Sequence, residues 1–211
     1  MMKLLYVPAL SIILICSVSS YSQLRNPSIR TIDFANFTYP YTVGLLLPPD
    51  KQRNFRLRGG SLPETKSAVG MSLGHVFYED VTRDGSEEAI VYLDVYTNGS
   101  ARPGCIYIYR MSNGRPQLLW AFDTGSRHYG GLRRVYADRG ELVVELYGRA
   151  KVIGRALFAN DGTLAQTPYP YAVTRTRYRW RVNRFSRVGK PEEFADPHPE
   201  KYGIPLFALK S

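Results

Sequence analysis

Three pairs of turn residues divide the second half of this chain into short segments of strand-like composition. Asn113-Gly114, Arg139-Gly140 and Asp161-Gly162 each follow one apolar or alternating run and precede another. Such pairs favour two-residue β-hairpin turns, because glycine and asparagine accept the positive φ that these turns require. The flanking runs are residues 105–111 and 117–122, 132–137 and 141–147, and 152–159 and 163–166.

The same pattern sets the fold class. Residues 31–42 are expected to form a first strand, and no stretch shows a sustained 3.6-residue apolar period, so little helix is expected. Successive hairpins form an antiparallel meander, and an open meander would expose its edges. We therefore predict an all-β protein whose hairpins close into a sandwich or a barrel.

Residues 87–96 are expected to form a central strand. Ala89, Val91 and Leu93 alternate with Ile90 and Tyr92, so both faces are apolar or aromatic. A strand of this kind is typical of a sheet that is covered on each side.

An acidic loop precedes this strand. Asp80, Thr82, Asp84, Ser86 and Glu88 stand at positions 1, 3, 5, 7 and 9 of the loop, and Gly85 stands at position 6. Oxygen atoms at this spacing can converge on a hard cation, with Ser86 offering its main-chain carbonyl, while glycine permits the sharp turn. The loop resembles that of FG-GAP (integrin-type) repeats, whose pattern is roughly D-x-[DN]-x-D-G-x-x-D before an apolar strand. The resemblance covers one copy and implies a calcium site.

Two arrangements without a metal are also consistent with these residues. Arg83 can supply the positive charge that the carboxylates need, and the backbone amides of the turn can satisfy Asp80 as in an Asx-turn.

A basic strand is expected over residues 174–182. Arg175, Arg177, Arg179 and Arg181 share one face, while Tyr178 and other apolar or hydroxyl side chains share the opposite face. Four guanidinium groups on one face predict an anion-binding surface. The alternative is that acids of a neighbouring strand pair with them.

The N-terminus has the order of a secretory signal peptide. Lys3 precedes an apolar run over residues 4–18, and small residues follow, so cleavage is expected after Ser20 or Ser22. We therefore predict a signal peptide over 1–22, a flexible lead over 23–30, one β-domain over 31–190 and a proline-rich extended tail over 191–211, exported to the periplasm or the extracellular space. Beyond the leader, no segment is long and apolar enough to cross a membrane.

Charge and candidate chemistry limit the function. An excess of 28 Lys and Arg over 18 Asp and Glu gives a net charge of +10, which favours an anionic polymer or protein surface as partner, without specific nucleic-acid binding. The leading hypothesis is a non-catalytic exported domain with a binding, scaffolding or surface-interaction role, with calcium as its one candidate cofactor. The alternative is a hydrolase of an envelope or extracellular polymer that uses Glu79 or Asp123 with His128. Cys105 is expected to be an inert buried thiol.

Overall fold

The computed structural model describes residues 27–40, 54–63, 69–96, 102–126, 130–153, 156–159, 172–201 and 203–208. The predicted signal peptide, the Asp161-Gly162 turn and His128 lie outside these residues. Within the described part of the chain, no helix has the length and apolar character needed to cross a bilayer.

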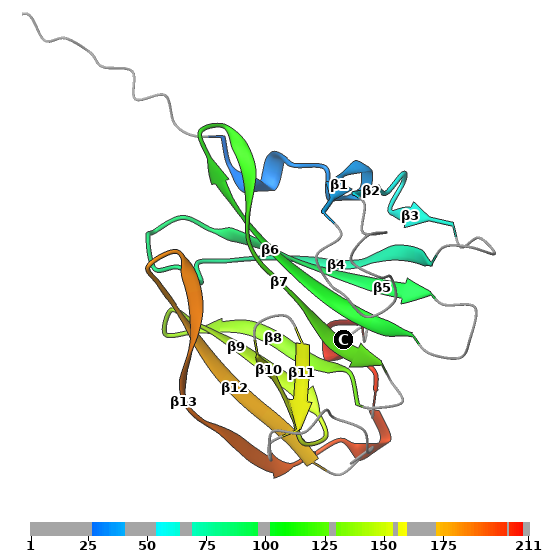
Figure 1. The fold of residues 1–211 in the computed structure, drawn as a ribbon, viewed down its shortest axis with the longest axis vertical. Helices are drawn as coiled ribbons and strands as arrows, with labels where there is room; N and C mark the ends of the chain where they lie inside the picture. The colour runs from blue at the N-terminus through cyan, green and yellow to red at the C-terminus, as the bar shows by residue number, and fades with distance from the viewer. Residues whose placement is uncertain are drawn as a thin grey trace, which may run out of the picture.

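Two antiparallel sheets form the body of the protein (Figure 1). The five-stranded sheet has the order β3-β4-β5-β6-β7, and the four-stranded sheet has the order β13-β12-β9-β8. Neither sheet closes into a barrel, so the predicted all-β fold is confirmed as a sandwich-like arrangement. The strands of the first sheet are β3 (Ser61–Leu62), β4 (Gly70–Glu79), β5 (Glu88–Tyr96), β6 (Pro103–Ser112) and β7 (Arg115–Ser126). Those of the second are β8 (Leu132–Asp138), β9 (Glu141–Tyr147), β12 (Ala172–Arg181) and β13 (Arg184–Ala195).

Strand β5 is covered on both faces, as its sequence predicts. Val91 and Leu93 belong to one hydrophobic core, and Ile90 and Tyr92 belong to a second. The alternation of side chains along a strand separates the two sets. The five-stranded sheet is therefore the middle layer of the molecule.

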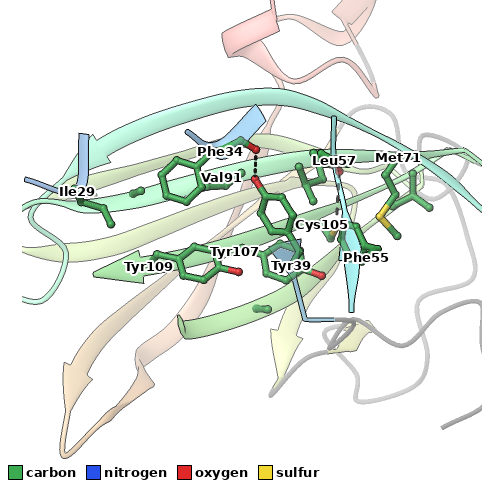
Figure 2. Packing of buried hydrophobic residues seen from close by; sticks show 14 residues of the cluster. Ile29, Phe34, Tyr39, Phe55, Leu57, Met71, Val91, Cys105, Tyr107 and Tyr109 are labelled. Carbon is green, nitrogen blue, oxygen red and sulfur yellow. Dashed lines mark hydrogen bonds between the residues drawn. The ribbon is translucent and has the colours of Figure 1, made fainter. Parts of the chain in front are cut away.

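The N-terminal segments cover the outer face of this sheet. They comprise η1 (Ile29–Thr31), η2 (Phe34–Asn36), β1 (Thr38–Tyr39) and β2 (Phe55–Arg56). Tyr39 is fully buried, stacks on Phe55 at 5.4 Å between ring centroids, and donates a 2.8 Å hydrogen bond to the Phe34 carbonyl (Figure 2). The prediction of a single strand over 31–42 was wrong. Ser28 and Asp33 accept hydrogen bonds from backbone amides two or three residues later, and each starts a short 3₁₀ helix instead.

The four-stranded sheet encloses the second core against the other face of β4–β7. Phe122 of β7, Leu142 and Val144 of β9, and Tyr178 of β12 are buried there. The ring of Tyr92 lies across the neighbouring strands, because Cβ atoms at Gly74 and Gly104 would come within 2.6 Å and 2.5 Å of its ring carbons. Glycine at these two positions makes that close approach possible.

Three hairpins have two-residue turns with positive φ at both positions, typical of type I′. Asn113-Gly114 joins β6 to β7 and Arg139-Gly140 joins β8 to β9, as the sequence predicts. The third turn, Val182-Asn183, joins β12 to β13. The prediction of one strand over 152–159 was wrong, because β10 (Ala150–Ile153) and β11 (Ala156–Ala159) already form a hairpin within it.

The ends of the chain differ from the expected boundaries. Ile29 is buried in the first core, although it falls in the segment predicted as a flexible lead. Strand β13 continues to Ala195, beyond residue 190, and is followed by η5 (Pro199–Lys201) and η6 (Leu206–Ala208). Phe207 packs on Phe77 and Tyr92, so η6 lies against the second core.

Candidate functional site

The loop between β4 and β5 is stabilised by its own backbone. Asp80 accepts hydrogen bonds from the amides of Arg83 at 2.7 Å and Gly85 at 3.1 Å, one on each carboxylate oxygen. Asp84 accepts a 2.9 Å hydrogen bond from the Ser86 amide. These are the contacts of Asx-turns.

Glu88 closes the loop from the strand side. One of its oxygens accepts from the amides of Val81 at 2.9 Å and Thr82 at 3.1 Å, and the other accepts from the Thr82 hydroxyl at 3.0 Å. The side chain is fully buried, and this burial raises the pKa of Glu88 to about 7 although the hydrogen bonds oppose the shift. The carboxyl group therefore acts as an internal acceptor for two loop amides.

This geometry bears on the predicted calcium site. Asp80, Asp84 and Glu88 already direct oxygens at amide hydrogens, so the loop is held together without a cation. Among the described residues, no group of three or more His, Cys, Asp and Glu side chains is arranged to hold a metal. The residues as placed fit the metal-free arrangement, and calcium binding stays a prediction.

Arg83 is directed away from these carboxylates. Its guanidinium donates to the carbonyl of Arg139 in the β8–β9 turn, and any side chain at Gly140 would collide with it. The acidic loop of one sheet is thus tied to a turn of the other.

Three of the four arginines predicted as an anion-binding face lie in ion pairs. Arg175 pairs with Glu145 at 2.9 Å and with Glu192 at 3.4 Å. Arg177 pairs with Asp138 at 2.8 Å, which lowers the pKa of that carboxyl. The third, Arg179, donates to Glu141 from its Nε at 3.1 Å. The acids come from β9, which pairs with β12, from β8 on the far side of β9, and from β13 on the other side of β12.

A buried group of three charged residues continues this network, because it shares Glu145 with Arg175. Arg133 pairs with Glu145 at 2.5 Å and with Asp196 at 3.4 Å, and all three side chains are buried. Glu145 also accepts from the Tyr136 hydroxyl at 3.1 Å. A charge enclosed in this way is stabilised only while its partners remain, so this part of the face is structural.

Arg181 has a different environment at the tip of the β12–β13 hairpin. It lies directly opposite Arg184, with Val182 and Asn183 as the turn between them. Four cationic side chains of this hairpin are exposed and have no acidic partner among the described residues: Arg181, Arg184, Arg187 and Lys190. The tip of the hairpin lies on the left of Figure 1.

The apolar residues of this hairpin were not predicted as part of a site. Phe185 packs on Trp180 at 5.0 Å and on Trp120 at 5.4 Å between ring centroids. The signal available in the sequence is the run Trp180 to Phe185, in which two aromatic residues enclose two arginines, a valine and an asparagine.

The carboxylates considered for catalysis lie apart. Glu79 is exposed at the end of β4, opposite Glu88. Asp123 lies beside a bulge of β7, opposite Cys105, where burial raises the pKa of its carboxyl to about 7. Nearby, the hydroxyls of Thr124 and Ser126 are buried without a hydrogen-bond partner in the described part of the chain. Cys105 is a buried free thiol whose pKa burial raises further.

Comparison of this chain with protein-family models, curated proteins and solved structures finds no match. The fold and the site together define a sandwich-like all-β protein with a basic hairpin tip, and its function is argued from these residues alone.

Proposed function

We propose that this protein is an exported, non-catalytic binding domain that attaches to anionic partners through the β12–β13 hairpin. The observation that carries the proposal is the set of exposed cations Arg181, Arg184, Arg187 and Lys190, for which no described acid serves as partner. A cluster of like charge without counter-charges attracts anions and accelerates their encounter with the protein.

The hairpin tip is favoured over the strand face because of charge pairing. Arg175, Arg177 and Arg179 already share the carboxylates of Asp138, Glu141, Glu145 and Glu192. An external anion would have to displace these groups, whereas at Arg181 and Arg184 it displaces only water.

Retention on a heparin column at increasing salt tests the proposal. The variant Arg181→Gln/Arg184→Gln is compared with Arg177→Gln/Arg179→Gln, which removes the same two charges from the paired face. We expect the first variant to elute at clearly lower salt than the native protein. The second should elute later than the first, because its arginines do not form the binding surface.

Equal elution of the two variants would show that retention follows net charge alone. Elution of both at the native salt concentration would overturn the proposal. Far-ultraviolet circular dichroism of each variant confirms that the fold is retained.

A second candidate function is favoured by Asp123. A carboxyl group with a pKa of about 7 is suited to general acid–base catalysis, and bulges such as the one beside Asp123 often adjoin active sites. Release of reducing ends from envelope polysaccharides, abolished in Asp123→Asn but retained in Cys105→Ala, would support the hydrolase and contradict a non-catalytic role.

A further inference from the structure

The tip of the β12–β13 hairpin departs from local structural preferences. Val182 has a φ of 46°, which is unfavourable for a β-branched residue, and its side chain is 94% exposed. Such a turn normally contains asparagine or glycine. An apolar side chain held in water by an unfavourable backbone conformation is a candidate for contact with a partner.

The two residues that flank this turn add a second departure. Arg181 and Arg184 face each other across the hairpin, and like charges placed directly opposite destabilise a strand pair. Among the described residues neither guanidinium has an acidic partner. An anion between them would relieve this repulsion.

Apolar groups continue from the tip along the inner face of the hairpin. Behind Val182 lie Trp180 and Phe185, and next to Phe185 is a hollow of ≈ 310 Å³. Arg187 is at the rim of this hollow, and Ile153, with 46% of its surface exposed, borders it. The residues that line it are Trp120, Val152, Ile153, Tyr178, Phe185 and Arg187. Val182 and Ile153 are the two exposed large hydrophobic residues of the described chain.

We infer that this hairpin docks on an anionic lipid surface, with Val182 entering the bilayer interface and Arg181 and Arg184 at the phosphates. The inference rests on the proposed function, since it specifies the anionic partner of the same hairpin. A dissolved polyanion would satisfy the arginines but leave Val182 in water. A bilayer offers anionic headgroups directly above apolar chains, and an amphipathic element can enter its boundary by about 5–10 Å.

The expected loss of vesicle binding can be stated for the two arginines and for Val182. Each arginine near an anionic leaflet strengthens binding by roughly fivefold, so loss of both should weaken it by about 25-fold at low salt. Removal of the Val182 side chain should weaken binding by about tenfold, given its apolar area. Glycine also accepts the positive φ at this position, so Val182→Gly should fold at least as stably as the native protein.

Co-sedimentation with vesicles tests the inference. Vesicles of phosphatidylglycerol and phosphatidylcholine are compared with vesicles of phosphatidylcholine alone. The native protein should bind the anionic vesicles, Val182→Gly and Arg181→Gln/Arg184→Gln should bind them less, and Arg177→Gln/Arg179→Gln should bind more strongly than the tip double variant. The sequence has two tryptophans, so Trp120→Phe leaves Trp180 as the reporter, whose emission should shift to shorter wavelength on anionic vesicles.

The outcomes separate this inference from the proposed function. Heparin retention that depends on Arg181 and Arg184, without binding to anionic vesicles, would leave the proposed function and overturn lipid docking. Vesicle binding that Val182→Gly leaves unchanged would also overturn it, because no apolar contact would be involved. A loss of vesicle binding in Val182→Gly with native retention on heparin would support insertion at the tip.

Discussion

Glu88 is an acidic residue enclosed at the point where the β4–β5 loop enters the central strand. Its folded-state pKa is about 7, against 4.5 for an unperturbed glutamate. The folded protein therefore binds this proton more tightly than the unfolded chain does. The stabilising contribution is complete below about pH 4.5 and is lost as the pH rises through about 7. Asp123 also makes the folded protein less stable as the pH rises, because its pKa is raised from 3.8 to about 7.

We therefore expect the melting temperature to fall between about pH 5 and about pH 8, and Glu88→Gln to reduce that fall. The glutamine oxygen can accept from the Val81 and Thr82 amides, while its amide donates to the Thr82 hydroxyl. Thermal melting at several pH values checks this expectation. Glu88→Ala is the contrasting variant and should cost on the order of 2–4 kcal/mol, because two loop amides lose their acceptor. An unchanged pH profile in Glu88→Gln would contradict the role given to this carboxyl group.

The positions of these residues were partly predictable. The alternation along residues 174–182 predicts which side chains share a face, and Arg175, Arg177 and Arg179 do share one. It does not show that Glu145, 30 positions from Arg175, and Glu141, 38 positions from Arg179, lie beside them. Likewise, the spacing of Asp80, Asp84 and Glu88 marks a loop with converging oxygens, but amides and a cation attract the same oxygens, and spacing alone does not distinguish between them.

Among the elements, the β4–β5 loop permits a direct test of the calcium hypothesis. Its carboxylates already accept hydrogen bonds from six donor groups, which belong to five loop residues. Calcium binding predicts a melting temperature that is higher in excess calcium than in chelator, and a rise that disappears in Asp84→Ala. Equal melting temperatures in the two buffers would contradict the calcium hypothesis and support the metal-free loop.

The β12–β13 hairpin shows why some elements escape prediction. Asn113-Gly114 and Arg139-Gly140 contain glycine, which marks a turn in the sequence, whereas both residues of Val182-Asn183 have positive φ without glycine. The sequence therefore carries no glycine signal at this turn, and the prolines after residue 190 suggest a tail although β13 continues to Ala195. In β10–β11 the sequence misleads in the opposite way, because Asp161-Gly162 is the stronger turn signal although β10 and β11 pair with each other before it.

At the scale of the whole molecule, β5 and β6 join the two hydrophobic cores. Val91 and Tyr107 lie in one core, and Ile90 and Ile106 lie in the other, so neither core can be lost without exposing the same two strands. The sequence predicted this covered central strand from its apolar character on both faces. The sequence did not predict which segments cover this strand, because the N-terminal segments and the four-stranded sheet contact it through residues that are far away in the sequence.

This arrangement predicts a single cooperative unfolding step that is insensitive to reducing agent, since Cys105 is a buried free thiol. Phe207 of η6 tests how far the C-terminus belongs to the same unit. Its ring centroid lies 4.9 Å from that of Phe77 and 5.1 Å from that of Tyr92. Phe207→Ala should therefore cost about 2 kcal/mol and lower the midpoint of the whole transition. Calorimetry and near-ultraviolet circular dichroism should report the same shifted midpoint. A separate early transition, with the main midpoint unchanged, would mean that η6 unfolds independently of the two cores.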